Sequence, residues 1–395
     1  MKIAVFSDNF YPETNSGITE SITTIGRELA SRGHHINFFA PRYSKKNFDH
    51  LKLPFGETDL GPNINITRFA SLPFNTGTEN GRLIIPFGRI SSVKSFQPDI
   101  IHVHLPFGMG LEGLIAAKIL KIPLVGTNHT PVEFTRKFLP GWLSWFAEIN
   151  LAYNTWFYNR CNFVSSPASG MFEEMRSFNS AIPHRAVSNP LKTEFFVPLG
   201  NKAELKKKYG FEDFNLLFIG RLSKEKNVDQ LIRAAAKLKS KIPSFSVGIA
   251  STGPAESELR RLTKKLGLQA EVRFLGFLEK EKLLETYNAS DVFVMPSTVE
   301  TQSLSSMEAM LCGLPVVAVR SMGLQEYLKP EAGFLLTPGD VDGLADKILY
   351  LYTNTRERIK MGEAARASVV HLNKKEIATK WEEIYTETIK NYAKK

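Results

Sequence analysis

Two glutamates are the side chains whose type and spacing most clearly predict chemistry. Glu300 and Glu308 are separated by seven residues and straddle the start of a helical pattern that follows the apolar segment 292–295. If this helix begins near Gln302, its first backbone N–H groups have no intrahelical acceptor and, with the helix dipole, form an anion site. Glu300 then lies beside the anion, and Glu308 can accept hydrogen bonds from vicinal hydroxyls such as those of a ribose. Alternatively, the two glutamates could only complement the positive end of the helix dipole. That role explains neither their spacing nor the strand-like segment 313–317.

A second group of polar residues follows another strand-like segment. Residues 218–232 read FIGRLSKEKNVDQLI, in which Gly220 permits a tight turn and Arg221 and Lys226 project from the loop before a helix. A guanidinium grips a diphosphate as a fork, whereas an ammonium acts as a point charge. Basic loop residues are usually only solvated, so this interpretation depends on the anion site beside them. Together the two segments predict a diphosphate site.

Parallel strands are needed to hold these loops. In the N-terminal half, apolar runs at 3–6, 36–40, 100–103 and 123–126 alternate with helical patterns at 18–31 and 111–120. In the second half, strands are expected at 216–219, 245–249, 272–274, 292–295 and 316–318, and helices at 228–239, 256–266, 280–289 and 305–311. This alternation is typical of doubly wound parallel sheets, which bind ligands at the carboxyl ends of their strands.

The chain is long enough for two such domains. The segment 189–208 contains two prolines and interrupts the periodic pattern, so the join is expected there. We therefore predict an α/β protein with one Rossmann-like domain over residues 1–195 and a second over residues 196–373. The amphipathic C-terminal helix 374–395 is expected to pack back on the first domain.

These segments resemble the retaining glycosyltransferases of family 4, which have the GT-B fold. The hallmarks are the Glu-x7-Glu element and a Gly-Arg-Leu-x-x-x-Lys loop, here residues 220–226. The resemblance covers essentially the whole chain. It also includes NSGI (15–18), PDIIHVHLPFG (98–108), GTNHT (126–130), STGP (251–254), VRFLGFL (272–278) and EAGFLLTPGD (331–340). It implies two Rossmann-like domains that face a cleft, with the acceptor on the N-terminal side and the donor on the C-terminal side.

The resemblance also implies a role for each matching residue. Arg221 and Lys226 would bind the donor diphosphate and stabilise its charge as the sugar departs. Glu300 would contact hydroxyls of the transferred sugar, Glu308 would hold the ribose, and His129 would reach the sugar near the reacting carbon. The other donor-binding positions are Gly17, Gly220, Gly253, Phe277, Leu278, Gln302, Ser303 and Leu304. In two places the chain departs from the family pattern, with Ser16 and Ser303 where glycine is usual.

No metal ion or other cofactor is expected. Arg221, Lys226 and the helix terminus would together neutralise the diphosphate. His102 and His104 have a spacing that metal ligands can have, but no convincing third ligand accompanies them, so they are interpreted as packing or cleft-shaping residues. The Asp-Val-Asp string at 340–342 follows a Pro-Gly turn and opens a helix, which predicts a helix cap and not a metal motif.

The expected acceptor is a membrane lipid. The ETQ form of the glutamate element, with HVHLPFG, resembles bacterial diacylglycerol glucosyltransferases and lipid mannosyltransferases. The aromatic-rich segment 134–163 either lies in a membrane interface or packs as core against the sheet, and the sequence leaves both open. We expect a metal-independent, retaining hexosyltransferase that uses a nucleotide-sugar, with UDP-hexose favoured, and a lipid such as diacylglycerol. A soluble sugar or polysaccharide precursor is the alternative acceptor.

The charge and the first loop of the sequence bear on other functional classes, such as nucleic-acid binders and dehydrogenases. The 50 basic and 40 acidic residues give a net charge of +10 that is spread along the chain. Such a charge is compatible with peripheral contact with an anionic membrane, but it lacks the clustering that a nucleic-acid binder needs. The first strand is followed by SDNFYPETNSG, without the GxGxxG of a dinucleotide-binding dehydrogenase.

The cellular location is expected to be the cytoplasm. Two widely spaced cysteines, no signal-peptide pattern and no long uncharged apolar run predict a cytoplasmic protein, at most peripheral on the cytosolic face of a membrane. The rival function is that of a GT-B relative that binds nucleotide-sugars without transferring them. The full set of polar site residues argues against it.

Overall fold

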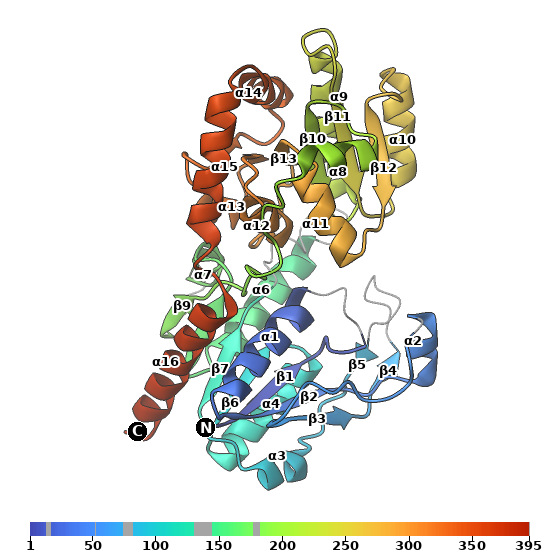
Figure 1. The fold of residues 1–395 in the computed structure, drawn as a ribbon. Coiled ribbons are helices and arrows are strands. Elements are labelled where there is room, and N and C mark those ends of the chain that lie inside the picture. The colour runs from blue at the N-terminus through green and yellow to red at the C-terminus, as the bar shows by residue number, and fades with distance from the viewer. Residues whose placement is uncertain (13–16, 52, 74–81, 130–143, 177–181, 395) are drawn as a thin grey trace. The chain divides into compact units, whose positions relative to one another are not determined.

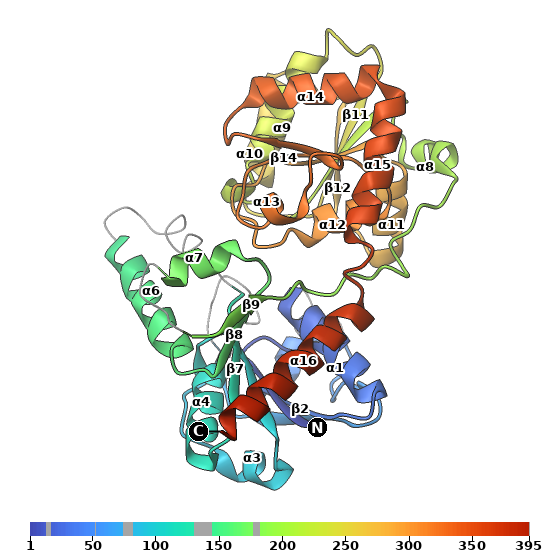
Figure 2. The same ribbon diagram turned by 90° about the vertical axis from the view of Figure 1, so that its left-hand side faces the viewer.

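The chain folds into two compact units. The structure, a computed structural model, describes residues 1–12, 17–51, 53–73, 82–129, 144–176 and 182–394. Unit 1 comprises residues 1–190 and 374–395, and unit 2 comprises residues 191–373. Figures 1 and 2 show the elements of both units from two directions. Within the described residues, no helix has both the length and the apolar character needed to cross a membrane.

Unit 1 contains a seven-stranded parallel sheet in the order β3-β2-β1-β6-β7-β8-β9. Its strands are β1 (Lys2–Ser7), β2 (His35–Pro41), β3 (Ile64–Phe69), β6 (Ile100–His104), β7 (Leu124–Thr127), β8 (Phe163–Ser166) and β9 (His184–Ala186). β6, β7 and β8 are buried along their whole length, which explains their continuous apolar runs. The order of the strands reverses between β1 and β6, so this is the topological switch point of unit 1.

Helices complete unit 1. They are α1 (Gly17–Ser31), α2 (Lys45–His50), α3 (Ile90–Phe96), α4 (Gly108–Leu120), α6 (Ser144–Tyr158), α7 (Gly170–Arg176) and α16 (Lys374–Tyr392). Two short strands, β4 (Leu72–Pro73) and β5 (Arg82–Leu83), form a separate antiparallel pair. The C-terminal helix α16 packs against α1, as Figure 2 shows, and its Glu382 bridges Arg32 and His34.

Unit 2 contains a six-stranded parallel sheet in the order β12-β11-β10-β13-β14-β15. Its strands are β10 (Asn215–Ile219), β11 (Ser246–Ala250), β12 (Val272–Gly276), β13 (Val292–Met295), β14 (Val316–Val319) and β15 (Gly333–Leu336). Its helices are α8 (Lys202–Tyr209), the 3-10 turn η2 (Lys224–Lys226), α9 (Val228–Leu238), α10 (Glu256–Lys265), α11 (Lys280–Asn288), α12 (Leu304–Leu311), α13 (Leu324–Tyr327), α14 (Val341–Thr353) and α15 (Thr355–Val369). The switch point of unit 2 lies between β10 and β13.

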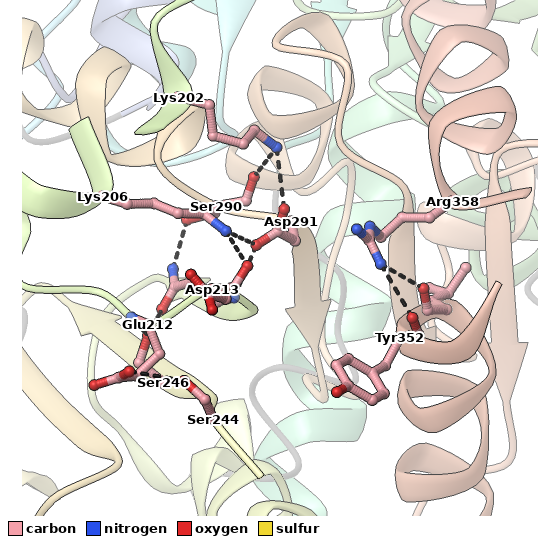
Figure 3. Close-up of polar contacts among 12 residues, drawn as sticks. Lys202, Lys206, Glu212, Asp213, Ser244, Ser246, Ser290, Asp291, Tyr352 and Arg358 are labelled. Carbon is pink, nitrogen blue, oxygen red and sulfur yellow. Dashed lines mark hydrogen bonds and ion pairs between the residues drawn. The ribbon is translucent and has the colours of Figure 1, made fainter. Parts of the chain in front are cut away.

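The amino ends of the unit 2 strands are held by a buried carboxylate (Figure 3). Asp291 Oδ2 lies 2.6 Å from Lys206 Nζ and accepts a hydrogen bond from the backbone N–H of Asn215 at 2.9 Å. The Asn215 side chain is in turn hydrogen-bonded to Ser246 at 2.7 Å, which ties β10 to β11. These contacts lie before the strands, at the edge opposite to the loops that carry the predicted site, so they stabilise the sheet without contributing to that site.

Candidate active site

The predicted basic loop and the predicted acidic element meet at the switch point of unit 2. Lys226 Nζ lies 2.6 Å from Glu300 Oε1. Lys226 follows β10 and Glu300 follows β13, and these two strands are neighbours in the sheet. The Glu300 side chain is 9% exposed and that of Lys226 is 21% exposed, so the ion pair is largely shielded from water. An ammonium and a carboxylate are therefore fixed at the sheet edge where open α/β sheets bind ligands.

Two contacts hold this ion pair in place. Asn227 has a left-handed backbone (φ 49°) and donates from Nδ2 to the Pro296 carbonyl at 3.3 Å, which joins the two loops. On the other side, the backbone N–H of Gly323 donates to the Glu300 carbonyl at 2.8 Å. A Cβ atom at Gly323 would lie 2.1 Å from the Thr301 carbonyl oxygen, so only glycine permits this approach.

We expect Gly323→Ala to damage catalysis more than folding. The added methyl must push residues 300–302 away, and overpacking of this kind costs about 1–3 kcal/mol of stability. A displacement of Glu300 by an ångström is expected to lower kcat/KM roughly 100-fold. Gly333→Ala is the matched control, because its Cβ would lie 2.0 Å from the Val316 carbonyl at the amino edge of the sheet. It should lower Tm comparably and leave kcat/KM of the folded protein near the wild-type value. Equal losses of kcat/KM in both variants would contradict the placement role of Gly323.

The helix after Glu300 begins close to its expected start. α12 starts at Leu304, one residue before the expected range 305–311 and two residues after Gln302, because Ser303 adopts a left-handed backbone (φ 59°) and ends the loop as the helix N-cap. This conformation favours glycine, which accounts for the glycine that is usual at this position of the family pattern, and Ser303 adopts it here in place of glycine. The Ser303 hydroxyl lies 2.7 Å from the Ser306 hydroxyl. Among the described residues, the backbone N–H groups of Leu304 and Ser305 have no hydrogen-bond acceptor, so they remain available to an anion.

Glu308 is positioned by a tyrosine that the sequence analysis did not identify. The buried Tyr287 hydroxyl lies 3.0 Å from Glu308 Oε2 and 3.0 Å from the Ser305 carbonyl oxygen. Burial raises the pKa of Tyr287, so its hydroxyl remains a donor. Tyr287 is on α11, 21 residues before Glu308, and only the tertiary structure brings the two side chains together.

The remaining donor-binding candidates of unit 2 lie in loops that follow its strands. Arg221 is exposed directly after Gly220, and among the described residues its guanidinium forms no hydrogen bond or ion pair. Gly253 packs against the loop itself, since a Cβ there would lie 2.3 Å from the Leu222 carbonyl oxygen. At the end of β12, Phe277 is 70% exposed and Leu278 is half-buried. Gln302 is buried beside Met307, 3.3 Å from its sulfur.

In unit 1, the predicted histidine lies in a chain of imidazoles. His129 follows β7, and its Nε2 lies 2.9 Å from Nδ1 of His104 at the end of β6. His102 is buried and hydrogen-bonded to Tyr385 and to Thr127, each at 2.7 Å. Burial lowers the pKa of His129 to about 4 and that of His102 to about 3, and it lowers the pKa of His104 as well. All three rings are therefore neutral at pH 7. Gly17 is exposed at the first position of α1.

Asp8 is a further candidate that the sequence analysis missed. It directly follows β1, beside β6, at the switch point of unit 1. Its Oδ1 accepts a hydrogen bond from the backbone N–H of Met109 at 2.9 Å, whereas its Oδ2 is buried and has no partner among the described residues. Burial raises the pKa of Asp8 to about 7. The rule that identified Arg221, a polar residue directly after a strand, would also have identified Asp8.

The raised pKa of Asp8 predicts a pH-dependent cost to stability. The folded protein binds a proton on this carboxyl up to a pH of about 7, whereas the ordinary value is 3.8, so stability falls as the pH rises between these values. Asp8→Asn keeps the acceptor for Met109 and removes the charge. We expect it to match the wild type near pH 4 and to be about 4 kcal/mol more stable at pH 8. Thermal melts of both proteins across this range measure the difference, and parallel curves would show that Asp8 titrates normally.

The Asp-Val-Asp string has the predicted capping role. The Asp340 side chain accepts a hydrogen bond from the Gly343 backbone N–H at 2.7 Å and caps α14. Within the described ranges, no group of three or more His, Cys, Asp or Glu side chains is arranged to hold a metal ion. Cys161 and Cys312 are both buried and unbridged.

Comparison with known proteins matches each unit to a glycosyltransferase family. The family described as Glycosyl transferases group 1 matches residues 201–368, and the family Glycosyltransferase Family 4 matches residues 15–195. An alpha-monoglucosyldiacylglycerol synthase of Streptococcus pneumoniae is 27% identical over 357 residues, which are 88% of this chain and 78% of the relative. A GDP-mannose-dependent alpha-mannosyltransferase of Mycolicibacterium smegmatis is 27% identical over 397 residues, 99% of this chain and 97% of the relative.

Solved structures share the fold. The sucrose-phosphate synthase of Thermosynechococcus elongatus superposes with a TM-score of 0.76 at 20% identity, covering 98% of both chains. HepE of Anabaena, in complex with UDP and glucose, gives a TM-score of 0.74 at 20% identity and covers 98% of this chain and 100% of that chain. With two doubly wound parallel sheets and family matches that span residues 15–195 and 201–368, the chain belongs to the family-4 glycosyltransferases of GT-B fold.

Proposed function

We propose that the protein is a retaining hexosyltransferase that moves a sugar from a nucleotide-sugar, with UDP-hexose favoured, to a hydroxyl group of a membrane lipid such as diacylglycerol. The observation that carries this proposal is the Lys226–Glu300 ion pair, 2.6 Å long and largely shielded from water. The ammonium suits a diphosphate, and the carboxylate suits the hydroxyls of the attached sugar. Unit 2 would bind the donor and unit 1 the acceptor, on the cytosolic face of a membrane.

Different residues of unit 2 would then bind different parts of the donor. Arg221 and Lys226 would hold the diphosphate, joined by the free N–H groups of Leu304 and Ser305 at the start of α12. Glu308, held by Tyr287, would accept hydrogen bonds from the ribose. Phe277, with its exposed ring after β12, would contact the base. Lys226 would exchange its contact with Glu300 for the phosphate, which frees Glu300 for the sugar.

The chemical step we propose occurs on one face of the sugar. The bond between the anomeric carbon and the phosphate oxygen breaks, and its electrons leave with the diphosphate. The acceptor oxygen bonds to the anomeric carbon on the same face, and its proton passes to the departing phosphate oxygen. Arg221 and Lys226 stabilise the charge that develops on the diphosphate. His129, which is neutral at pH 7, would serve as a hydrogen-bonding group at the sugar and not as a cation.

The acceptor and donor classes rest on the relatives and on the sequence motifs. One relative is by name a monoglucosyldiacylglycerol synthase, and another is by name a GDP-mannose-dependent mannosyltransferase. A panel of UDP-glucose, UDP-galactose and GDP-mannose, each offered with diacylglycerol in mixed micelles or with free sugars, tests both choices. We expect transfer to diacylglycerol. Transfer only to a soluble sugar would replace the acceptor class, and binding without transfer or hydrolysis would establish a non-transferring relative.

We also expect activity without a metal ion. Arg221, Lys226 and the α12 terminus supply the positive charge that a divalent cation supplies in other transferases. Turnover in excess EDTA should equal turnover in untreated buffer. A loss that added Mg²⁺ or Mn²⁺ restores would show that the charge of the diphosphate is neutralised in another way.

A further inference from the structure

An exposed apolar stripe runs along α6. Trp145, Ile149 and Trp156 are 55%, 54% and 42% exposed, and their spacing of four and seven residues places them on one face of the helix. We call these three residues the α6 stripe. The opposite face of α6 is core, because Ala147, Leu151, Phe157 and Tyr158 are buried. One face of α6 is therefore core and the other is exposed, and residues 134–143 of the aromatic-rich segment lie outside the described residues.

The α6 stripe continues onto the loop before α4. The ring of Tyr153 stacks on Trp156, with centroids 5.8 Å apart, and on Phe107, with centroids 6.4 Å apart. Phe107 is itself exposed and directly precedes α4. On the other side of this helix end, Phe87 is 72% exposed, and its backbone N–H donates to Glu112 of α4 at 2.9 Å. Exposed aromatic side chains thus lie beside α6 and on two segments that contact the N-terminal part of α4.

This surface borders the edge of the sheet where the acceptor would bind. Phe107 follows β6 by three residues, and the Tyr153 hydroxyl donates to the Pro106 carbonyl in the same loop. Asp8 also contacts the first turn of α4, through the Met109 N–H. Figure 2 shows α6 at the margin of unit 1. Aromatic side chains therefore lie next to the switch point of unit 1, where a lipid acceptor would have to arrive.

We infer that the α6 stripe, with Phe107 and Phe87, docks unit 1 onto the interface of a lipid bilayer. Tryptophan prefers the level of the lipid headgroups, where its ring is partly buried and its N–H is hydrated. At the end of the stripe, the Arg160 guanidinium lies 4.2 Å from the Trp156 ring and can reach headgroup phosphates. A second copy of the chain would bring the same net charge of +10, whereas an anionic membrane offers the opposite charge. The inference rests on the proposed function, because it explains how a lipid acceptor reaches the site.

Vesicle flotation of the full chain tests this surface. The probe is a vesicle of phosphatidylcholine and phosphatidylglycerol, and the variant carries Trp145→Gln, Ile149→Gln and Trp156→Gln. We expect the variant to bind vesicles roughly tenfold more weakly or not at all. The matched control carries Ile119→Gln, Ile359→Gln and Val370→Gln, which remove three other exposed apolar side chains. It should bind like the wild type. Equal binding by the stripe variant and the wild type would overturn the inference.

Fluorescence quenching locates the contact. In a Trp142→Phe background, which leaves Trp145, Trp156 and Trp381 as the emitting residues, lipids with brominated acyl chains should quench the tryptophan emission, and Trp145→Phe with Trp156→Phe should abolish most of this quenching. Trp381 is buried in α16 and provides an unquenched reference. Unchanged quenching in this variant would place the membrane contact elsewhere. A stripe variant that turns a dimer into a monomer, with no wild-type binding to vesicles, would assign the surface to self-association instead.

The docking test is independent of the transfer test. Hydrolysis of a nucleotide-sugar in the absence of vesicles needs only the donor site, so the stripe variant should retain the wild-type rate. If vesicles bind but no lipid is glycosylated, the proposed acceptor fails and the docking surface stands. If lipid in detergent micelles is glycosylated while vesicles are not bound, the docking surface fails and the proposed function stands.

Discussion

Lys226→Ala and Arg221→Ala should each lower kcat/KM roughly 30- to 1,000-fold, which corresponds to a loss of about 2–4 kcal/mol of transition-state stabilisation. Both cations would face the charge that develops on the departing diphosphate, and a contact made mainly in the transition state is lost from kcat as well as from kcat/KM. Steady-state kinetics with a saturating acceptor measure both quantities. Lys224→Ala is the matched control, since Lys224 lies exposed on the same 3-10 turn and its loss changes the net charge equally.

The two variants should differ in stability, because only one of the two cations is paired. Lys226 neutralises the buried carboxylate of Glu300, so its removal leaves that charge uncompensated and should lower Tm. Arg221 is exposed, and its removal should leave stability within about 0.5 kcal/mol. A double-mutant cycle of Lys226→Ala with Glu300→Gln should show strong coupling of the stability changes. Wild-type-like turnover in Lys226→Ala or Arg221→Ala, or an equal loss in Lys224→Ala, would remove this loop from the mechanism.

The fold could be predicted because its strands are buried on both faces. Runs such as 216–219 and 292–295 are continuously apolar, and each became a strand within a residue or two of the expected ends. The helix expected at 305–311 was confirmed as α12, which starts at Leu304, but the left-handed backbone of Ser303 just before it has no local signal in the sequence. Edge elements such as β9 and the β4–β5 pair have few apolar residues and gave no clear pattern.

The residues of the site likewise fall into those that the sequence predicts and those that only the tertiary structure reveals. Arg221, Lys226, Glu300 and Glu308 have local signals, because each follows a strand or opens a helix. The Lys226–Glu300 pair joins residues 74 positions apart, and no spacing rule predicts that contact. Tyr287 was missed because a tyrosine near the end of a helix has no distinguishing pattern, although its hydroxyl orients Glu308.

Glu300→Gln is expected to reduce kcat by at least 100-fold while leaving the affinity for the free nucleotide nearly unchanged. Glutamine keeps the size of the side chain but gives up the charge that holds Lys226 and that would accept hydrogen bonds from the sugar. On the proposed function, the nucleotide would be held elsewhere, by Glu308 and the basic loop. Glu308→Gln, seven residues further into the element, should show the opposite pattern, with weaker nucleotide binding and a smaller change in kcat. Titration calorimetry with UDP or GDP and single-turnover kinetics separate the two effects.

The product and the enzyme together distinguish two roles of Glu300, as a nucleophile or as a carboxylate that orients the hydroxyls of the sugar. A double-displacement mechanism needs a carboxylate nucleophile at the anomeric carbon and a second acid about 5–5.5 Å away. The partner that the structure gives Glu300 is a cation, Lys226, at 2.6 Å, which suits a carboxylate that orients hydroxyls beside a phosphate. Same-face attack assisted by the leaving diphosphate fits this arrangement, and it retains the anomeric configuration of the donor. We therefore expect the anomeric proton of the product to show the coupling constant of the donor's configuration by NMR, with no glycosyl adduct on Glu300 by mass spectrometry. An adduct would make Glu300 the nucleophile, and an inverted product would exclude same-face transfer altogether.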